Sequence, residues 1–123
     1  MVGGQGLIES DDLVFGALAL EVIFVQTQVV HQGVPYGTAI GMGRLVGDGG
    51  CFFQVVDIAV DPAHQGRGLG KAIMAALTVF MADKLPPSAY VSLIADVPAQ
   101  ELYKQFGFQE TAPRSLGMAR RAG

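Results

Sequence analysis

The pattern of hydrophobic and polar positions divides the chain into a strand-rich first half and a second half that alternates helices with strands. A helix-start signal at residues 10–12 is followed by apolar residues at helical spacing, which predicts a helix over residues 13–21. Three β-branched, apolar stretches separated by glycine-rich turns then predict strands: 22–31, 38–46 and 52–60. Together the three strands predict an antiparallel meander.

The second half begins with an amphipathic helix. Leu69, Ile73 and Leu77 recur on one helical face and predict a helix over residues 69–84, which two consecutive prolines then end.

Three further elements complete the chain. Residues 89–95 predict a strand, and a second helix runs from Pro98 to a point before Gly107. Residues 108–111 and 115–120 predict a closing hairpin. A strand, a helix and another strand imply a right-handed crossover and a parallel pair, so we expect an α+β fold whose sheet is mixed but mostly antiparallel.

Composition limits the classes of function. At 123 residues, half of them hydrophobic, the chain is expected to form one small domain, residues 1–123. Its net charge of -3 argues against a nucleic-acid partner. The acidic balance suits a cationic amine substrate, although a solvated surface explains it equally well.

Other signals are weak. Cys51 is the only cysteine, which excludes an internal disulfide, and we expect it to be a small buried apolar side chain. His31 and His64 lack metal-site spacing, so no metal is expected. The longest charge-free run, residues 22–43, contains glutamines, a proline and glycines, so we expect no membrane span. No export signal is apparent, which makes the cytoplasm the expected compartment.

The segment with the most functional signals is the one that links the third predicted strand to the first long helix. Three glycines alternate with longer residues in it, and such a loop can approach a ligand closely and turn its amides inward. The positive end of the following helix lies at the same place. Arg67 and Lys71 add two cations that either contact phosphates or are simply solvated. These features favour a phosphate ligand.

Three phosphate-binding patterns compete for this loop. A Walker A loop needs a glycine where Gln65 stands and a hydroxyl where Ala72 stands. A Rossmann loop needs G-x-G-x-x-G, whereas Gly66, Gly68 and Gly70 give G-x-G-x-G. The third pattern, Q/R-x-x-G-x-G/A after a strand, fits Gln65, Gly68 and Gly70 fully.

That pattern resembles the signature of the GNAT superfamily of N-acetyltransferases. The segment from Leu102 to Phe108, LYKQFGF, is similar to the LYxxxGF segment that the family carries near its C-terminus, and residues 57–62 resemble the family's fourth strand and its exit. The resemblance covers residue 41 to about residue 118. It implies the GNAT fold and, as cosubstrate, acetyl-CoA.

The resemblance also implies which residues contact the coenzyme. Backbone groups at the end of the third strand pair with the pantetheine arm, and loop amides hold the pyrophosphate. Gln65 braces the loop or meets a phosphate. The expected coenzyme-binding residues are Ile58, Ala59, Val60, Gln65, Gly66, Arg67, Gly68, Leu69, Gly70, Lys71 and Tyr103.

Two residues are candidates for catalysis. By resemblance Tyr103 points at the coenzyme sulfur and acts as the acid for the leaving thiolate, which suits a phenol with an ordinary pKa near 10; the alternative is an ordinary packed tyrosine. Asp57 is a carboxylate on a mostly apolar strand, which is costly unless it is paired. It binds substrate, acts as the base, or pairs with Arg44; a water chain is the alternative base. Asp96 is expected to cap the next helix.

The family normally has a strand and one more helix ahead of the elements found here. We therefore expect a domain that lacks the usual first strand and part of the N-terminal helices, with an open sheet edge that a homodimer covers. The expected function is acetyl transfer from acetyl-CoA to the primary amine of a small molecule by direct attack in a ternary complex. The alternative is a non-catalytic acyl-CoA-binding or regulatory module.

Overall fold

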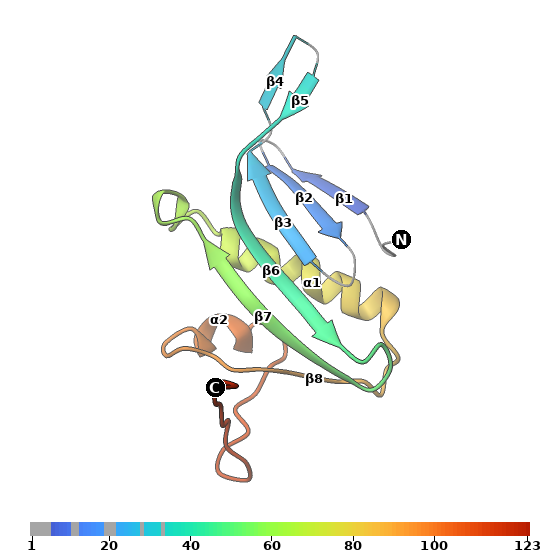
Figure 1. Ribbon diagram of the computed structural model, residues 1–123, viewed down its shortest axis with the longest axis vertical. Helices are drawn as coiled ribbons and strands as arrows, with labels where there is room; N and C mark the ends of the chain where they lie inside the picture. Colours follow the sequence, from blue (N-terminus) through green and yellow to red (C-terminus); the bar gives the residue numbers. More distant parts are fainter. Residues whose placement is uncertain (1–5, 11–12, 19–21, 28, 33) are drawn as a thin grey trace.

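The computed structural model describes residues 6–10, 13–18, 22–27, 29–32 and 34–123. Its main sheet has six strands in the order β1-β2-β3-β6-β7-β8 (Figure 1). The strands are β1 (Gly6–Ser10), β2 (Leu13–Leu18), β3 (Val22–Thr27), β6 (Ala39–Gly47), β7 (Phe52–Val60) and β8 (Tyr90–Leu93). All neighbours are antiparallel except β7 and β8, which run parallel.

Two helices and a small hairpin accompany the sheet in the part of the chain that the structure describes. Helix α1 (Leu69–Lys84) lies along one face of the sheet, and the short helix α2 (Gln100–Lys104) lies near the end of α1 that follows β7 (Figure 1). Strands β4 (Val29–His31) and β5 (Val34–Tyr36) form a separate hairpin that projects from the sheet. A single 3-10 turn, η1 (Pro62–His64), connects β7 to the glycine loop. Among the described residues, no helix has the length and apolar character needed to cross a membrane.

The core forms where α1 packs on the middle of the sheet. Its buried side chains come from β6, β7 and α1: Ile40, Leu45, Phe53, Val55, Leu69, Ile73, Met74, Ala76 and Leu77. The predicted helical stripe of Leu69, Ile73 and Leu77 is therefore the buried face of α1. Burying each large apolar side chain contributes about 1.5–3 kcal/mol. The core thus fixes α1, and the loop before it, against β6 and β7.

Several predicted elements are confirmed. Strand β7 and helix α1 have the predicted bounds, 52–60 and 69–84, and the crossover between β7 and β8 gives the predicted parallel pair. The α+β class with a mostly antiparallel sheet is also confirmed.

The predicted helix over residues 13–21 is wrong. Leu13–Leu18 is strand β2, paired on both sides with β1 and β3, so cross-strand pairing overrides the helical spacing there. Residues 11 and 12, part of the helix-start signal, and residues 19–21, the predicted end of the helix, lie outside the described residues. The meander begins at β1 rather than at residue 22. The single strand predicted over residues 22–31 is divided into β3 and β4.

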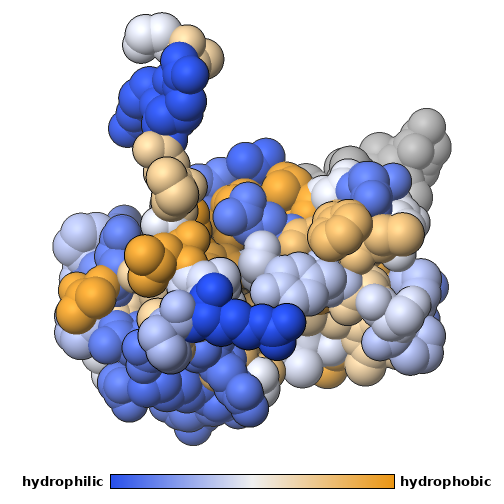
Figure 2. All heavy atoms as spheres, turned by 90° about the horizontal axis from the view of Figure 1, so that it is seen from below, coloured by the Kyte–Doolittle hydropathy of each residue, from blue (hydrophilic) through white to orange (hydrophobic). Residues whose placement is uncertain are grey.

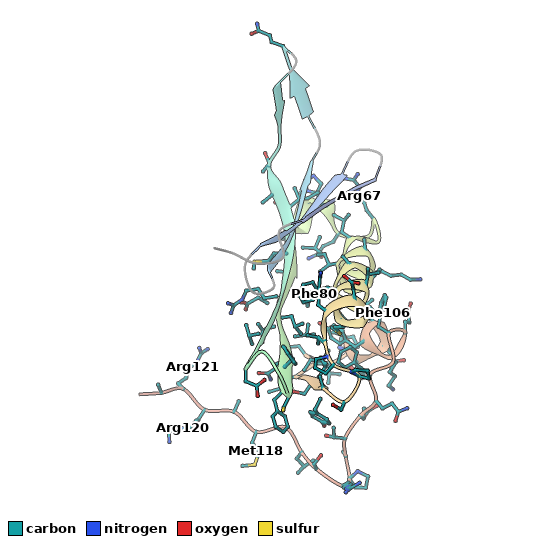
Figure 3. The ribbon with its side chains drawn as sticks, turned by 90° about the vertical axis from the view of Figure 1, so that its right-hand side faces the viewer. Arg67, Phe80, Phe106, Met118, Arg120 and Arg121 are labelled. Atoms are coloured by element: carbon teal, nitrogen blue, oxygen red, sulfur yellow. The ribbon has the colours of Figure 1, made fainter. Side chains whose placement is uncertain are left out.

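The predicted closing hairpin is also wrong. Residues 108–123, all of which the structure describes, form no strand. A local turn takes the place of the ladder: the Ser115 amide donates to the Thr111 carbonyl at 3.0 Å, and the Thr111 hydroxyl donates to the Ser115 carbonyl at 3.3 Å. Met118, Arg120 and Arg121 lie on a segment that extends away from the sheet (Figure 3).

Candidate functional site

The candidate site lies where β7 and β8 separate. Their pairing runs from Phe52 opposite Tyr90 to Val55 opposite Leu93, and β8 ends there while β7 continues to Val60. Figure 1 shows the two strands diverging beyond this point, with α2 beside the gap. The end of β7 after Val55 therefore has β6 on one side and no neighbouring strand on the other.

Hydrogen bonding shows how Val60 is oriented at that edge. The Asp61 amide donates to the Ile40 carbonyl of β6 at 2.7 Å. Because alternate residues of an antiparallel strand turn their backbone groups to the same neighbour, Val60 directs its N–H and C=O away from β6. The Gln65 side-chain amide donates to that Val60 carbonyl at 3.2 Å. Gln65 therefore braces the loop, which was one of its two predicted roles.

A β-bulge lies at Asp57. The register between β6 and β7 shifts between Met42 and Arg44, and Asp57 has a φ of 57°, in the left-handed region. The Arg44 Nε donates to Asp57 Oδ2 at 2.8 Å, and both side chains are partly exposed. Of the alternatives open for Asp57, the pairing with Arg44 is the one that the structure contains. The bulge interrupts the regular alternation of side chains along β7 at this carboxylate.

The glycine loop follows directly. Asp61 Oδ1 accepts the Ala63 amide at 2.9 Å and begins the 3-10 turn. Gly66 and Gly68 have φ values of 82° and 78°, which L side chains rarely adopt. A Cβ at either position would have no atom within 4 Å, so open space lies over the loop.

Helix α1 begins at this loop, with Gly68 as its N-cap residue and no side chain capping it. The first amides of a helix have no partner within the helix, and with the helix dipole they attract an anion. Leu69 is buried and anchors the turn, whereas Arg67 and Lys71 are exposed. The loop thus combines backbone conformation, open space and positive charge, as the sequence predicts for a phosphate site.

The two sequence motifs meet in space. A Cβ on Gly70 would lie 3.6 Å from Leu102 Cδ2, which places α2 against the first turn of α1. The next residue, Tyr103, is half-buried, with its ring edge-on to Phe108 at a centroid distance of 6.4 Å. Burial, followed by the negative charge of Asp96, raises the pKa of the Tyr103 phenol above its usual 10.0. The Tyr103 phenol is therefore protonated at neutral pH.

Tyr103 also lines a cavity of about 300 Å³ between the end of β8, α2 and the segment that follows α2. Gln100 lines the same cavity, and its Oε1 atom is buried without a hydrogen-bond partner. Sequence reasoning missed Gln100. The one available signal was its position three residues before Tyr103, which places both side chains on one helical face. His64 Nδ1, ahead of the glycine loop, is likewise buried and unpartnered.

Two minor expectations are wrong. Asp96 does not cap α2 through its side chain: the helix begins four residues later, and the Asp96 backbone carbonyl accepts the Ala99 amide at 2.7 Å. Cys51 is exposed, because it lies in the turn before β7 and not in the strand itself. In the part of the chain that the structure describes, no three His, Cys, Asp or Glu side chains cluster as metal ligands would.

Comparison with known proteins agrees with this geometry. The chain matches the family model of the acetyltransferase (GNAT) domain over residues 11–110. A crystal structure from Staphylococcus aureus, described as a probable acetyltransferase, is 41% identical with a TM-score of 0.68, and the match covers 81% of this chain and 69% of that one. A Mycobacterium tuberculosis protein solved in complex with CoA is 25% identical with a TM-score of 0.55, over 83% of this chain and 54% of that one.

A curated relative from Glycine max, "Histone acetyltransferase TAP1", is 35% identical over 81 residues, which is 64% of this chain. The match spans 33% of that relative's length. The chain belongs to the GNAT acetyltransferase domain family.

Proposed function

We propose that this chain is an N-acetyltransferase that moves an acetyl group from acetyl-CoA to the primary amine of a small molecule by direct attack in a ternary complex. The observation that carries the proposal is the open glycine loop of Gly66 and Gly68 at the start of α1, next to the free edge of β7. The glycine loop suits a pyrophosphate, and the free strand edge suits the extended, amide-containing pantetheine arm. The relative solved with CoA supports the same cosubstrate.

The loop residues bind the phosphates in this proposal. The amides of Gly66 to Lys71 hold the pyrophosphate, Gln65 keeps the loop closed on Val60, and Arg67 and Lys71 supply positive charge. Ile58, Ala59 and Val60 meet the pantetheine arm through their backbone. The two loop glycines fit this role because a side chain there would occupy the open space in a strained conformation.

Tyr103 is the proposed acid. The amine nitrogen forms a bond to the acetyl carbon, the carbon–sulfur bond breaks, and the sulfur takes the Tyr103 phenolic proton while the amine releases its own proton. The raised pKa of Tyr103 keeps the phenol protonated before the thiolate leaves. Asp57, exposed beside the strand edge, or a water chain accepts the amine proton. Asp57 Oδ2 is held at 2.8 Å from Arg44 Nε, which fixes the position of the carboxylate.

Homodimerisation is part of the proposal. Within the described residues β1 pairs only with β2, so its other edge is free to take a strand from a second copy. Light scattering coupled to size-exclusion chromatography tests this directly, and we expect twice the mass of one 12.9 kDa chain. A mass of one chain at micromolar concentration would contradict it.

Turnover decides between the enzyme and a non-catalytic coenzyme-binding module. The assay mixes the protein with acetyl-CoA and a panel of primary amines and records the free thiol released. We expect thiol release that depends on one amine class, with acetylated amine identified by mass spectrometry. Saturable acetyl-CoA binding without any amine-dependent thiol release would instead support the binding module.

A further inference from the structure

The alternation of backbone groups along β7 shifts by one residue between its two ends. At the start, the Asp48 amide donates to the Phe52 carbonyl at 3.1 Å, so Phe52 faces β6. Just past the end, the Asp61 amide donates to the Ile40 carbonyl at 2.7 Å, so Asp61 also faces β6. In a regular antiparallel strand, residues that face the same neighbour are an even number of positions apart. Phe52 and Asp61 are an odd number apart, so β7 contains one extra residue.

The extra residue lies at the Asp57 bulge. On β7, Val56 and Ala59 pair with β6 residues that have only Gly43 between them. Asp57 and Ile58 therefore stand together opposite that one glycine, which is the arrangement of a bulge.

The bulge decides which backbone groups reach the free edge of β7. Without the extra residue, the alternation set at Phe52 would turn the N–H and C=O of Val60 toward β6. With it, Ile58 and Val60 face away from β6, and the Val60 carbonyl accepts from Gln65 Nε2 at 3.2 Å. The N–H and C=O of Ile58 and the N–H of Val60 are thus directed to the side on which an extended ligand can pair with the strand.

Arg44 holds the residue on which the bulge depends. Asp57 has a φ of 57°, which a residue other than glycine keeps only where its surroundings hold it. The Arg44 Nε donates to Asp57 Oδ2 at 2.8 Å, a short charge-assisted contact. Within the described residues it is the one hydrogen bond of the Asp57 side chain.

The arginine itself belongs to a rigid part of the sheet. Its strand is paired on both sides, with Arg44 opposite Val22 of β3 and Val56 of β7, and the next residue, Leu45, is completely buried. Beyond Val55, by contrast, β7 has β6 as its single neighbour in the described sheet. The ion pair therefore ties a segment held on one side to a strand held on both.

We propose that Arg44 is a positioning residue for the coenzyme: through Asp57 it holds the bulge, and the bulge directs the backbone of Ile58 and Val60 at the pantetheine arm. The inference rests on the proposed function and adds a residue to its coenzyme site. Arg44 itself contacts no part of the coenzyme. Its loss weakens the contacts of the arm and leaves the glycine loop, which the buried Leu69 anchors, unchanged.

The test compares two ligands that share a pyrophosphate: acetyl-CoA carries the pantetheine arm, and ADP does not. Arg44→Met removes the Nε donor and keeps an unbranched side chain. We expect it to raise the calorimetric Kd of acetyl-CoA about three- to fivefold, the size typical of a partly exposed ion pair. The Kd of ADP should not change.

Arg121→Met is the matched control, because it removes the same charge far from the bulge. Arg121 is exposed and lies on the segment that extends away from the sheet (Figure 3). Figure 2 shows this C-terminal segment projecting from the body of the molecule, with hydrophilic residues along it. The control should leave both Kd values unchanged.

A double-mutant cycle shows whether Arg44 acts through Asp57. Asp57→Gly removes the carboxylate and adopts a positive φ without strain. In that background Arg44→Met should leave the Kd of acetyl-CoA unchanged, because the contact that it would break is already absent. A long-range effect of the Arg44 charge would persist there. The cycle needs acetyl-CoA alone, so it decides even where ADP binds too weakly to titrate.

Three results would overturn the inference while leaving the acetyltransferase intact: an unchanged acetyl-CoA Kd in Arg44→Met, an equal loss for ADP and acetyl-CoA, or the same loss in the Asp57→Gly background. Absence of acetyl-CoA binding to the folded wild type would refute the proposed function, and with it this role of Arg44 toward the coenzyme. Amide hydrogen exchange of the free protein then decides whether Arg44 holds the bulge. The Ala59 amide, which faces β6, should exchange faster in Arg44→Met than in the wild type, and equal rates would refute the role of the ion pair.

Discussion

The backbone of β6 approaches α1 so closely at Gly43 that only glycine fits. A Cβ there would lie 2.5 Å from Ile58 Cδ1, 2.7 Å from Ile73 Cγ2 and 3.3 Å from Leu77 Cδ1. Ile73 and Leu77 are completely buried, so neither can move aside without displacing the core. Gly43 also lies at the register shift opposite the Asp57 bulge. Gly43→Ala therefore perturbs the core and the strand that carries the site.

The expected cost follows from these contacts. Overpacking a well-packed core typically costs about 1–3 kcal/mol. Two contacts at 2.7 Å or less place Gly43→Ala near the upper half of that range, so we expect about 2 kcal/mol of lost stability. For a domain of this size the melting temperature falls by roughly 6–10 °C. Gly50→Ala is the matched control, because its Cβ meets only Asp48 Oδ1, at 3.9 Å.

Both substitutions lower the entropy of the unfolded chain equally, so the difference between the two variants isolates the packing effect. Urea denaturation measures it. A double-mutant cycle identifies the contact: Ile58→Val removes the Cδ1 atom nearest the new methyl group, so Gly43→Ala costs less in that background. Equal stability of Gly43→Ala and Gly50→Ala, or strict additivity with Ile58→Val, would refute this account of the core.

Three further predictions concern single side chains. Asp48 Oδ1 accepts hydrogen bonds from the amides of Gly50, Cys51 and Phe52, which hold the pKa of Asp48 below the usual 3.8. The contribution of this carboxylate to folding stability is full above pH 3.8 and is lost as the pH falls through the lowered pKa. Melting temperatures of Asp48→Asn should therefore depend less on pH at the acid end than those of the wild type. Asp57→Asn should change the free energy of unfolding by less than about 1 kcal/mol, because the pair with Arg44 is exposed and Asn tolerates a positive φ. Asp57→Val should cost clearly more in denaturant titrations, because a β-branched residue is strained at that φ; equal stability of the two variants would contradict the bulge. Tyr103→Phe should lower kcat roughly 100-fold with acetyl-CoA binding retained. Because the pKa of Tyr103 is raised above 10.0, the wild-type rate should show little loss of this acid up to about pH 9. A basic limb near pH 8 that disappears in the variant would contradict the assignment.

Sequence patterns predicted the middle of the chain well because two independent signals agreed there. The strand over residues 52–60 is apolar at all positions except Gln54 and Asp57, and the helix over residues 69–84 has a glycine start, a regular stripe and a proline stop. Leu69, Ile73 and Leu77 are all buried as the stripe predicts. Local chemistry and tertiary packing favour the same structure in this region.

The structure of the two ends of the chain was harder to predict from the sequence, for identifiable reasons. The spacing of residues 13–18 fits a helix, but pairing with strands on both sides decides the structure, and pairing is not visible from local spacing. Residues 108–111 and 115–120 were predicted to form a hairpin, yet Phe108 packs on Tyr103 and the Thr111–Ser115 turn closes locally. A strand forms only where a neighbour offers its edge.

Part of the candidate site could be derived from the sequence. The glycine loop was identified from its three glycines, the helix that follows it and its family resemblance, and the structure gives Gly66 and Gly68 positive φ values with open space above them. Its role in phosphate binding stays a prediction. The Asp57 bulge and the unpaired Gln100 Oε1 could not be derived, since a register shift depends on two strands and burial depends on the whole fold.

Calorimetric titration with acetyl-CoA of the wild type, Gly68→Asn and Gly68→Asp tests the central claim most directly. Asn and Asp have the same size and both tolerate the φ of 78°, so they differ by one negative charge in the phosphate cradle. Two charges 4 Å apart interact by about 1 kcal/mol in water and about 4 kcal/mol near a protein surface. We predict binding by the wild type, weaker binding by Gly68→Asn, and at least tenfold weaker binding again by Gly68→Asp. Equal affinity of the two variants, or no heat from the folded wild type, would contradict the claim that this loop holds the coenzyme's phosphates.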